Sequence, residues 1–153
     1  MKKKIPVICL VLSLALVVVL GVQLAHTAAE SRRLQKRIDS GFVEAFAQFA
    51  SVVLPAENAE TMEEASRRRC EMDTARYLYL AARLSISSSY RTECENLYFL
   101  VARLNFLSQT EKLSDVMTVE IKKDLMYLSA HMRDMEEADA LAAEIYEQIK
   151  DVS

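Results

Sequence analysis

No glycine and no proline occurs between Ala56 and Ser153. These two residue types are the strongest local breakers of helices and strands, so this part of the chain can form long, uninterrupted elements. In all 153 residues the only glycines are Gly21 and Gly41. A phosphate-binding loop, a dinucleotide-binding loop and the GxSxG elbow of hydrolases each need two glycines close together, so the sequence excludes all three.

Hydrophobic residues recur every three or four positions in four segments, which is the spacing of a helix with one buried face. These segments cover residues 34–53, 61–84, 94–107 and 114–150. Short polar links separate them, and short links favour antiparallel neighbours. We therefore predict an all-α fold in which about four helices form an up-down antiparallel bundle.

The predicted helix boundaries rest on polar residues that cap helices. Thr61 with Glu64 three residues later is a capping-box pattern, and Ser114 is an N-cap candidate. The three serines at 87–89 mark a break, because serine hydroxyls compete for backbone hydrogen bonds. Residues 114–150 form either one long helix or two, with a restart at Asp134 as the alternative.

The hydrophobic stripes predict which face of each helix is buried. In the third segment apolar residues lie around most of the circumference, so we expect this helix to be the most buried. In the second segment the predicted buried residues are Ala65, Met72, Ala75, Tyr79 and Ala82.

The N-terminal region predicts a membrane anchor. Lys2, Lys3 and Lys4 are followed by no charged residue until Glu30. A helix of residues 5–29 is roughly 37 Å long, which is enough to cross a hydrocarbon core of about 30 Å. We predict an anchor over residues 1–29 and the helical bundle over residues 30–153.

A cleaved signal sequence is the alternative to a retained anchor. The aliphatic run over residues 5–22 is longer than a signal peptide needs, and Ala25 and Ala28 make poor cleavage sites, because Gln23 and His26 stand where a small residue is required. We favour the retained anchor. Basic residues flank both ends, but lysines before an apolar run are typical of an export signal, so we expect a cytoplasmic N-terminus and an extracytoplasmic bundle.

Two features next to the predicted anchor are candidates for contacts. Arg32, Arg33, Lys36 and Arg37 follow it on one helical face, and we expect them to contact phospholipid headgroups; an anionic cell-wall polymer or an acidic partner is the alternative. Within the anchor, Gly21, Ala25 and Ala29 are spaced by four residues. Small residues at this spacing let two membrane helices approach closely, so they are candidates for homodimer or partner packing.

The cysteines are of interest because an extracytoplasmic site is oxidising. Cys70 and Cys94 lie 17 and 7 residues from Ser87, so an antiparallel hairpin staggers them by roughly 15 Å. A disulfide needs Cα atoms within about 7 Å, so we expect no bond between them. Cys70 follows three arginines that can make it a reactive thiol.

Few features of the sequence support catalysis or metal binding. His131 has Asp134 nearby, but the ligand number and spacing of a metal site are missing. The pairs Glu63–Glu64 and Glu136–Glu137 are candidates for acid-base catalysis only because they are carboxylates. We expect no enzymatic activity and no cofactor. All 22 acidic residues follow Ala29, so the bundle is net acidic and we expect no nucleic-acid binding.

The order of parts resembles the N-terminal region of YpeB-type spore germination proteins, which have a membrane anchor followed by a helical region. The similar stretches are Gly41–Phe46, Ala75–Leu84 and Phe99–Gln109. The resemblance implies an accessory protein that stabilises a cell-wall-lytic enzyme, with no catalytic residue to carry over.

Two functions are compatible with these features. The first is a membrane-anchored interaction module that binds an envelope protein or a second copy of itself. Because only four residues precede the apolar span that starts at Ile5, we expect no cytoplasmic output domain. The second is a bundle that senses a small molecule between its second and third helices. The residues considered for that pocket are Tyr77, Tyr79, Tyr90, Tyr98, Arg76 and Arg83.

Overall fold

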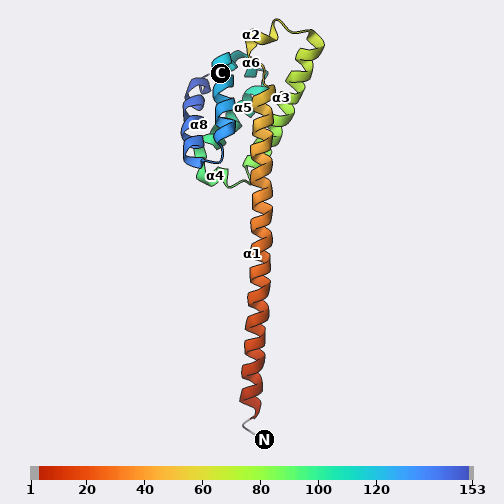
Figure 1. Cartoon of the computed structure of the whole chain (residues 1–153), viewed down its shortest axis with the longest axis vertical. Coiled ribbons are helices and arrows are strands. Elements are labelled where there is room, and N and C mark those ends of the chain that lie inside the picture. Colours follow the sequence, from red (N-terminus) through yellow and green to blue (C-terminus); the bar gives the residue numbers. More distant parts are fainter. Residues whose placement is uncertain (1–3, 152–153) are drawn as a thin grey trace. The chain divides into compact units, whose positions relative to one another are not determined.

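A computed structural model describes residues 4–151, apart from the side chains of residues 4–13 and 15. Within these residues the chain forms eight helices and no strand (Figure 1). The predicted all-α class is confirmed. The chain divides into two compact units, Met1–Lys36 and Arg37–Ser153.

The first unit consists of the beginning of helix α1, which runs over Lys4–Val52. The side chains of residues 5–13 and 15, which belong to the predicted anchor, lie outside the described residues. In the part of the chain that the structure describes, no helix is both long enough and apolar enough to span a membrane.

The second unit contains the end of α1 and seven further helices. These are α2 (Ala56–Ala59), α3 (Glu64–Ser85), α4 (Tyr90–Glu93), α5 (Glu95–Gln109), α6 (Leu113–Val116), α7 (Val119–His131) and α8 (Met135–Ile149). The segment predicted over residues 114–150 is therefore interrupted, and a helix restarts after Asp134. The carboxylate of Asp134 accepts a hydrogen bond from the backbone N–H of Glu137, which is an N-cap.

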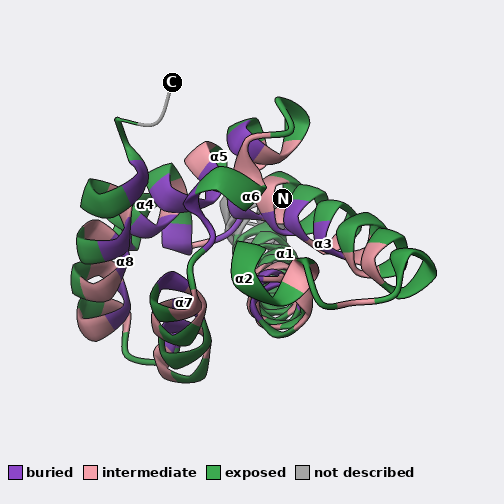
Figure 2. Cartoon of the chain, turned by 90° about the horizontal axis from the view of Figure 1, so that it is seen from above, coloured by how far each residue is buried: buried purple, intermediate pink, exposed green. Residues whose placement is uncertain are grey.

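The long helices of this unit stand side by side around one apolar core, as Figure 2 shows from above. Helix α5 lies against α3 and α8, and α7 lies against α8. The end of α1 completes the arrangement: the ammonium group of Lys122 in α7 donates to the carbonyl of Ser51, and Gly41 faces Leu84 of α3. The bundle thus has five long helices rather than about four.

Helices α5 and α8 run in the same direction, so these two neighbours are parallel rather than antiparallel. Asp139 near the start of α8 accepts hydrogen bonds from the backbone N–H groups of Asn96 and Leu97, at 2.8 and 3.2 Å. At the C-terminal end of α8, the guanidinium of Arg103, which lies in α5, donates to the carbonyls of Ile149 and Lys150. Each helix therefore satisfies backbone groups that the other leaves unpaired at its terminus.

The apolar core follows the predicted stripes in most helices. All five predicted residues of the third segment are buried, namely Cys94, Leu97, Val101, Leu104 and Leu107. In α1, Phe42, Phe46 and Phe49 are fully buried. Their rings lie 6.4 and 6.0 Å apart from one to the next, which suits tilted aromatic packing.

The buried face predicted for α3 is wrong. Met72 and Tyr79 are 73% and 52% exposed, whereas Thr74, Leu78, Ala81 and Ser85 are buried. Ser85 is tolerated inside because its hydroxyl donates to the carbonyl of Ala82 in the preceding turn. The prediction from apolar spacing failed because the buried face of α3 includes the small polar side chains of Thr74 and Ser85, whereas the larger apolar side chains of Met72 and Tyr79 are exposed.

Two predicted helix starts are also wrong. The hydroxyl of Thr61 donates to the carbonyl of Asn58, and α3 begins later, with Glu64 bound to arginines of its own helix instead of to a capping partner. Ser114 lies inside the one-turn helix α6. The long helix that follows is capped by Thr118, whose hydroxyl oxygen accepts from the N–H of Ile121 at 3.1 Å.

Candidate functional site

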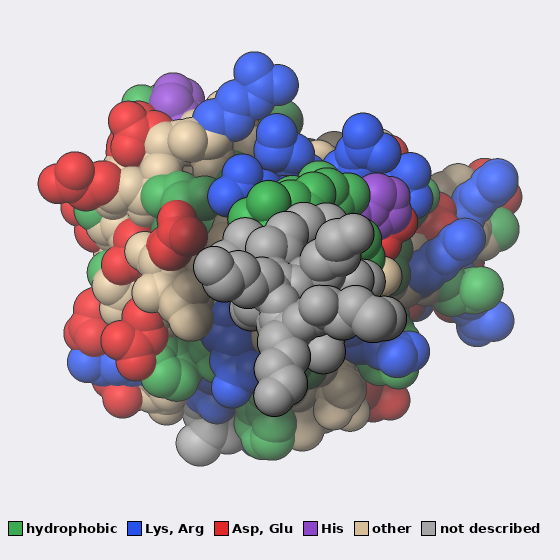
Figure 3. Space-filling model, turned by 90° about the horizontal axis from the view of Figure 1, so that it is seen from below, with side chains coloured by type: hydrophobic (Ala, Val, Ile, Leu, Met, Phe, Trp, Pro, Cys, Tyr) green, Lys and Arg blue, Asp and Glu red, His purple; other side chains and the backbone are tan. Residues whose placement is uncertain are grey.

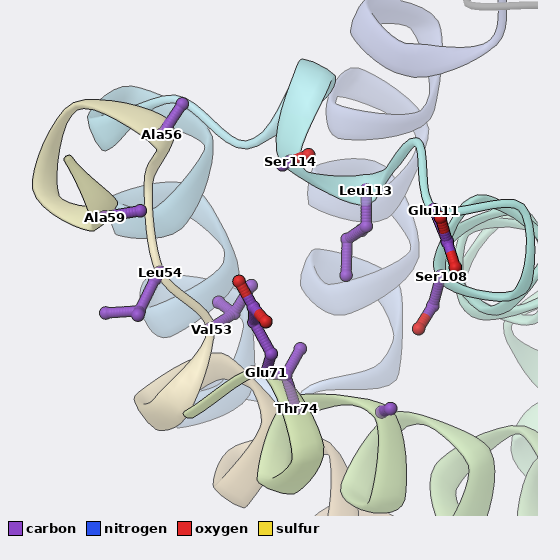
Figure 4. A pocket seen from close by; sticks show the side chains of 11 residues that line it. Val53, Leu54, Ala56, Ala59, Glu71, Thr74, Ser108, Glu111, Leu113 and Ser114 are labelled. Atoms are coloured by element: carbon purple, nitrogen blue, oxygen red, sulfur yellow. The ribbon is translucent and has the colours of Figure 1, made fainter. Parts of the chain in front are cut away.

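A cleft of about 470 Å³ lies in the second unit, between the end of α1, the short helices α2 and α6, the first half of α3 and the end of α5. Figure 4 shows Glu71 and Thr74 reaching into it from α3, Leu113 from α6, and Ser108 and Glu111 on another side. Eleven residues line it: Val53, Leu54, Ala56, Ala59, Glu71, Thr74, Ala75, Ser108, Glu111, Leu113 and Ser114. Its volume is within the range of small-molecule sites.

On the side of the cleft opposite α3 the backbone is fixed by turns. Pro55 has no N–H and follows the last turn of α1, and the N–H of Ala56 then donates to the carbonyl of Met117 at 3.0 Å. Three of the lining side chains are alanines, which leave space that larger residues would fill. The cleft thus lies between helix α3 and the turns that follow α1 and α5.

Glu111 has a positive φ of 60° in the turn after α5. This left-handed conformation costs a residue with a Cβ roughly 1–2 kcal/mol. The turn is closed by a hydrogen bond from the N–H of Lys112 to the carbonyl of Leu107 at 2.9 Å. A glycine is the usual residue at such a helix end, so the glutamate side chain at the cleft is held there at a conformational cost.

The charges of the cleft are acidic. The described lining residues include Glu71 and Glu111 and no Lys, Arg or His. Arg67 stands near, with one guanidinium nitrogen 3.5 Å from Oε1 of Glu71. The Nε and Nη2 atoms of Arg67 both donate to Glu64, so this cation is shared between two carboxylates.

None of the tyrosines and arginines considered for a sensing pocket lines this cleft. Tyr90 is buried, its ring packs 5.2 Å from that of Phe42, and its hydroxyl donates to the carbonyl of Met132. Tyr79 is exposed beside Arg83, and Tyr98 lies beside Arg91. The lining of this cleft could not be predicted from the sequence, because its alanines, serines and glutamates form no recognisable motif.

The two described cysteines are free and lie in different surroundings. Cys94 is buried, and its thiol donates to the carbonyl of Met135 at 3.4 Å. Burial raises the pKa of the Cys94 thiol to about 11, and the nearby Asp139 and Glu93 add to this effect. Cys94 is therefore a protonated structural residue at neutral pH. Cys70 is half-buried on α3, and its reactivity stays a prediction.

The other residues proposed for chemistry are dispersed. The guanidinium groups of Arg67 and Arg68 bind Glu64 and hold its pKa below the usual range. His131 stacks on Tyr127 with ring centroids 4.0 Å apart. In the region that the structure describes, no group of three His, Cys, Asp or Glu side chains is placed to hold a metal ion.

The residues beside the predicted anchor all lie on α1. Arg32, Arg33, Lys36 and Arg37 are exposed, and so are Gly21, Ala25 and Ala29. Nothing within 4 Å would meet a Cβ built on Gly21. The structure places both groups on one continuous helix, and their proposed contacts are with molecules outside this chain.

Comparison with known proteins gives no relative to guide the assignment. No family model, no curated protein and no solved structure matches this chain.

Proposed function

We propose that this protein is a membrane-anchored, non-catalytic interaction module, with the second unit outside the cytoplasm. The observation that carries the proposal is helix α1, in which an uncharged aliphatic stretch is followed directly by a cluster of exposed basic residues. Every large apolar side chain described in the first part of this helix is exposed: Leu14, Leu16, Val17, Val18, Val19, Leu20, Val22 and Leu24. Lipid is the surrounding in which such a surface is stable.

The basic cluster Arg32, Arg33, Lys36 and Arg37 fits the headgroup region next to such an anchor. Each basic residue near an anionic lipid surface contributes about 1 kcal/mol. Nucleic acid is a poorer partner for the bundle, because acidic side chains gather on the flank that carries α8 (Figure 3). Helix α8 itself contains five carboxylates and no Lys or Arg.

We expect a cysteine introduced at the C-terminus to be labelled by a membrane-impermeant maleimide on intact cells. The variant is Ser153→Cys with Cys9→Ala and Cys70→Ser, so that the buried Cys94 is the only other thiol. Labelling only after the membrane is ruptured would contradict the orientation, and a mature N-terminus near Ala29 would contradict the retained anchor.

A partner surface is supported by aromatic residues on the outside of α5. Phe99 and Phe106 are about half exposed and seven residues apart, so they lie on the same face of the helix. The guanidinium of Arg103 lies 5.5 Å from the ring centre of Phe106. Aromatic residues and arginine are enriched at the centres of protein interfaces. The resemblance to YpeB-type proteins directs the search for a partner to cell-wall-lytic enzymes.

We expect a photoreactive p-benzoylphenylalanine in place of Phe99 to cross-link to one discrete partner in native membranes. The same residue in place of Glu144, an exposed position of α8, is the control and should give no such product. A product of twice the chain's mass would identify the homodimer. Equal products from both positions, or none from either, would refute the partner surface.

A further inference from the structure

Helix α3 exposes a regular stripe of side chains on the side that faces away from the core. Figure 2 shows most of this helix as exposed, and its buried residues lie on one side only. The exposed residues repeat every seven positions in two adjacent rows, an arginine row of Arg69, Arg76 and Arg83 and an apolar row of Met72, Tyr79 and the C-cap Ile86. With 3.6 residues in a turn, these six residues, the outer stripe of α3, lie opposite the buried ones.

The arginines of the outer stripe lack the carboxylate partners that other arginines of the same helix have. Arg67 and Arg68 both bind Glu64, and Arg67 also approaches Glu71. Among the residues that the structure describes, no carboxylate oxygen lies within 4.0 Å of a guanidinium nitrogen of the three stripe arginines. The stripe therefore presents three positive charges that the carboxylates of a partner can neutralise.

Aromatic rings hold two of these arginines in place. The guanidinium carbon of Arg83 lies 5.9 Å from the ring centre of Tyr79, and that of Arg76 lies 6.0 Å from the ring centre of Tyr77. Both distances are typical of cation–π contacts. A side chain that is already ordered loses less conformational entropy when a partner binds.

The apolar row gives the stripe the composition of an interface. The sequence predicts Met72 and Tyr79 to be buried, but they are 73% and 52% exposed, and Ile86 is 52% exposed. Methionine, aromatic residues and arginine are enriched at protein interfaces. A strict repeat of seven residues is the pattern of helices that pair along their length. The row is therefore suited to contact with a helix outside this bundle.

From these features we infer that the outer stripe of α3 binds an acidic amphipathic helix of a partner protein. The carboxylates of that helix, seven residues apart, pair with the arginine row, and its apolar residues cover the apolar row. Arginine suits this role because its planar guanidinium binds a carboxylate through two hydrogen bonds. A second copy of α3 is a poor occupant, because its own arginines would repel this row. The inference concerns the second unit alone and depends neither on the membrane anchor nor on the aromatic residues of α5.

The test uses the full chain in phosphatidylcholine nanodiscs and a synthetic helical peptide of three seven-residue repeats. Each repeat carries one leucine and one glutamate on the same face, and a counterpart peptide has glutamine in place of every glutamate. Fluorescence anisotropy of the labelled peptides gives the affinity. NMR of the methionine methyl groups gives the location, since Met72 reports on the outer stripe and Met126, which is 49% exposed on α7, reports on another helix.

We expect the glutamate peptide to bind with a micromolar dissociation constant and to shift the methyl resonance of Met72 but not that of Met126. The glutamine peptide should bind about tenfold more weakly, because three exposed ion pairs are lost. Arg76→Glu should weaken binding of the glutamate peptide about tenfold, because repulsion replaces attraction at the centre of the arginine row. Added salt should weaken the glutamate peptide more than the glutamine peptide.

The matched control is Arg133→Glu, which makes the same charge change at an exposed arginine outside the stripe and should leave the affinity unchanged. Absence of saturable binding, equal affinities of the two peptides, or equal effects of Arg76→Glu and Arg133→Glu would overturn the inference. Self-association of the full chain in detergent that Arg76→Glu abolishes would overturn it in favour of a second copy. Displacement of the peptide when the nanodiscs contain phosphatidylglycerol would overturn it in favour of a lipid surface.

Discussion

Leu104→Ala is expected to lower the free energy of unfolding by about 2–5 kcal/mol, the range for leucines deleted from a packed core. Leu104 is 0% exposed in the middle of α5, the helix that lies against both α3 and α8. Removing its isobutyl group loses the transfer free energy of the side chain and leaves a cavity. Neighbouring helices cannot close this cavity without losing their own contacts.

The measurement is urea unfolding of the purified full chain, followed by circular dichroism. Leu80→Ala is the matched control, since it makes the same substitution at a helical leucine that is 44% exposed. Its cost should stay below about 1 kcal/mol, because less apolar surface is involved and no closed cavity forms. Equal costs for the two variants would mean that α5 does not form the centre of the core.

The sequence was sufficient to predict the helical class and most of the core. Leu97 and Val101 in α5 are four residues apart and buried, and so are Phe42 and Phe46 in α1. Apolar residues at this spacing lie on one side of a helix, so they can be buried together. The restart at Asp134 is one of the two alternatives that the sequence leaves open, and it could be named because its cap lies within the same short stretch of chain. Local signals of this kind need no knowledge of the neighbouring helices.

Contacts between distant helices were not predictable from the same patterns. In the sequence nothing distinguishes Asp139 and Arg103 from other exposed charged residues. In the structure Asp139 of α8 caps the start of α5, and Arg103 of α5 binds a carbonyl at the end of α8. The face of α3 was misassigned because burial of Thr74 and Ser85 depends on what packs against them. The cleft escaped prediction for a similar reason, since its lining comes from five segments of the chain.

Because α5 and α8 are parallel neighbours, Asp139 near the start of α8 stabilises the start of α5. Its Oδ1 accepts from two backbone N–H groups of α5, and its Oδ2 accepts from the side-chain amide of Asn96 at 2.8 Å. Cys94, which precedes α5, makes no side-chain cap of its own. The start of α5 therefore depends on a carboxylate supplied by another helix.

Asp139→Ala is expected to lower the free energy of unfolding by about 1–3 kcal/mol, as for removal of an N-cap or of a charged hydrogen-bond acceptor. Glu144→Ala, an exposed carboxylate of the same helix, should change it by less than about 0.5 kcal/mol. Amide hydrogen exchange gives the sharper readout: the N–H groups of Asn96 and Leu97 should lose protection in Asp139→Ala and keep it in Glu144→Ala. Since only the pairing of α8 with the start of α5 places Asp139 at these amides, unchanged protection would refute that pairing, and the parallel arrangement of the two helices with it.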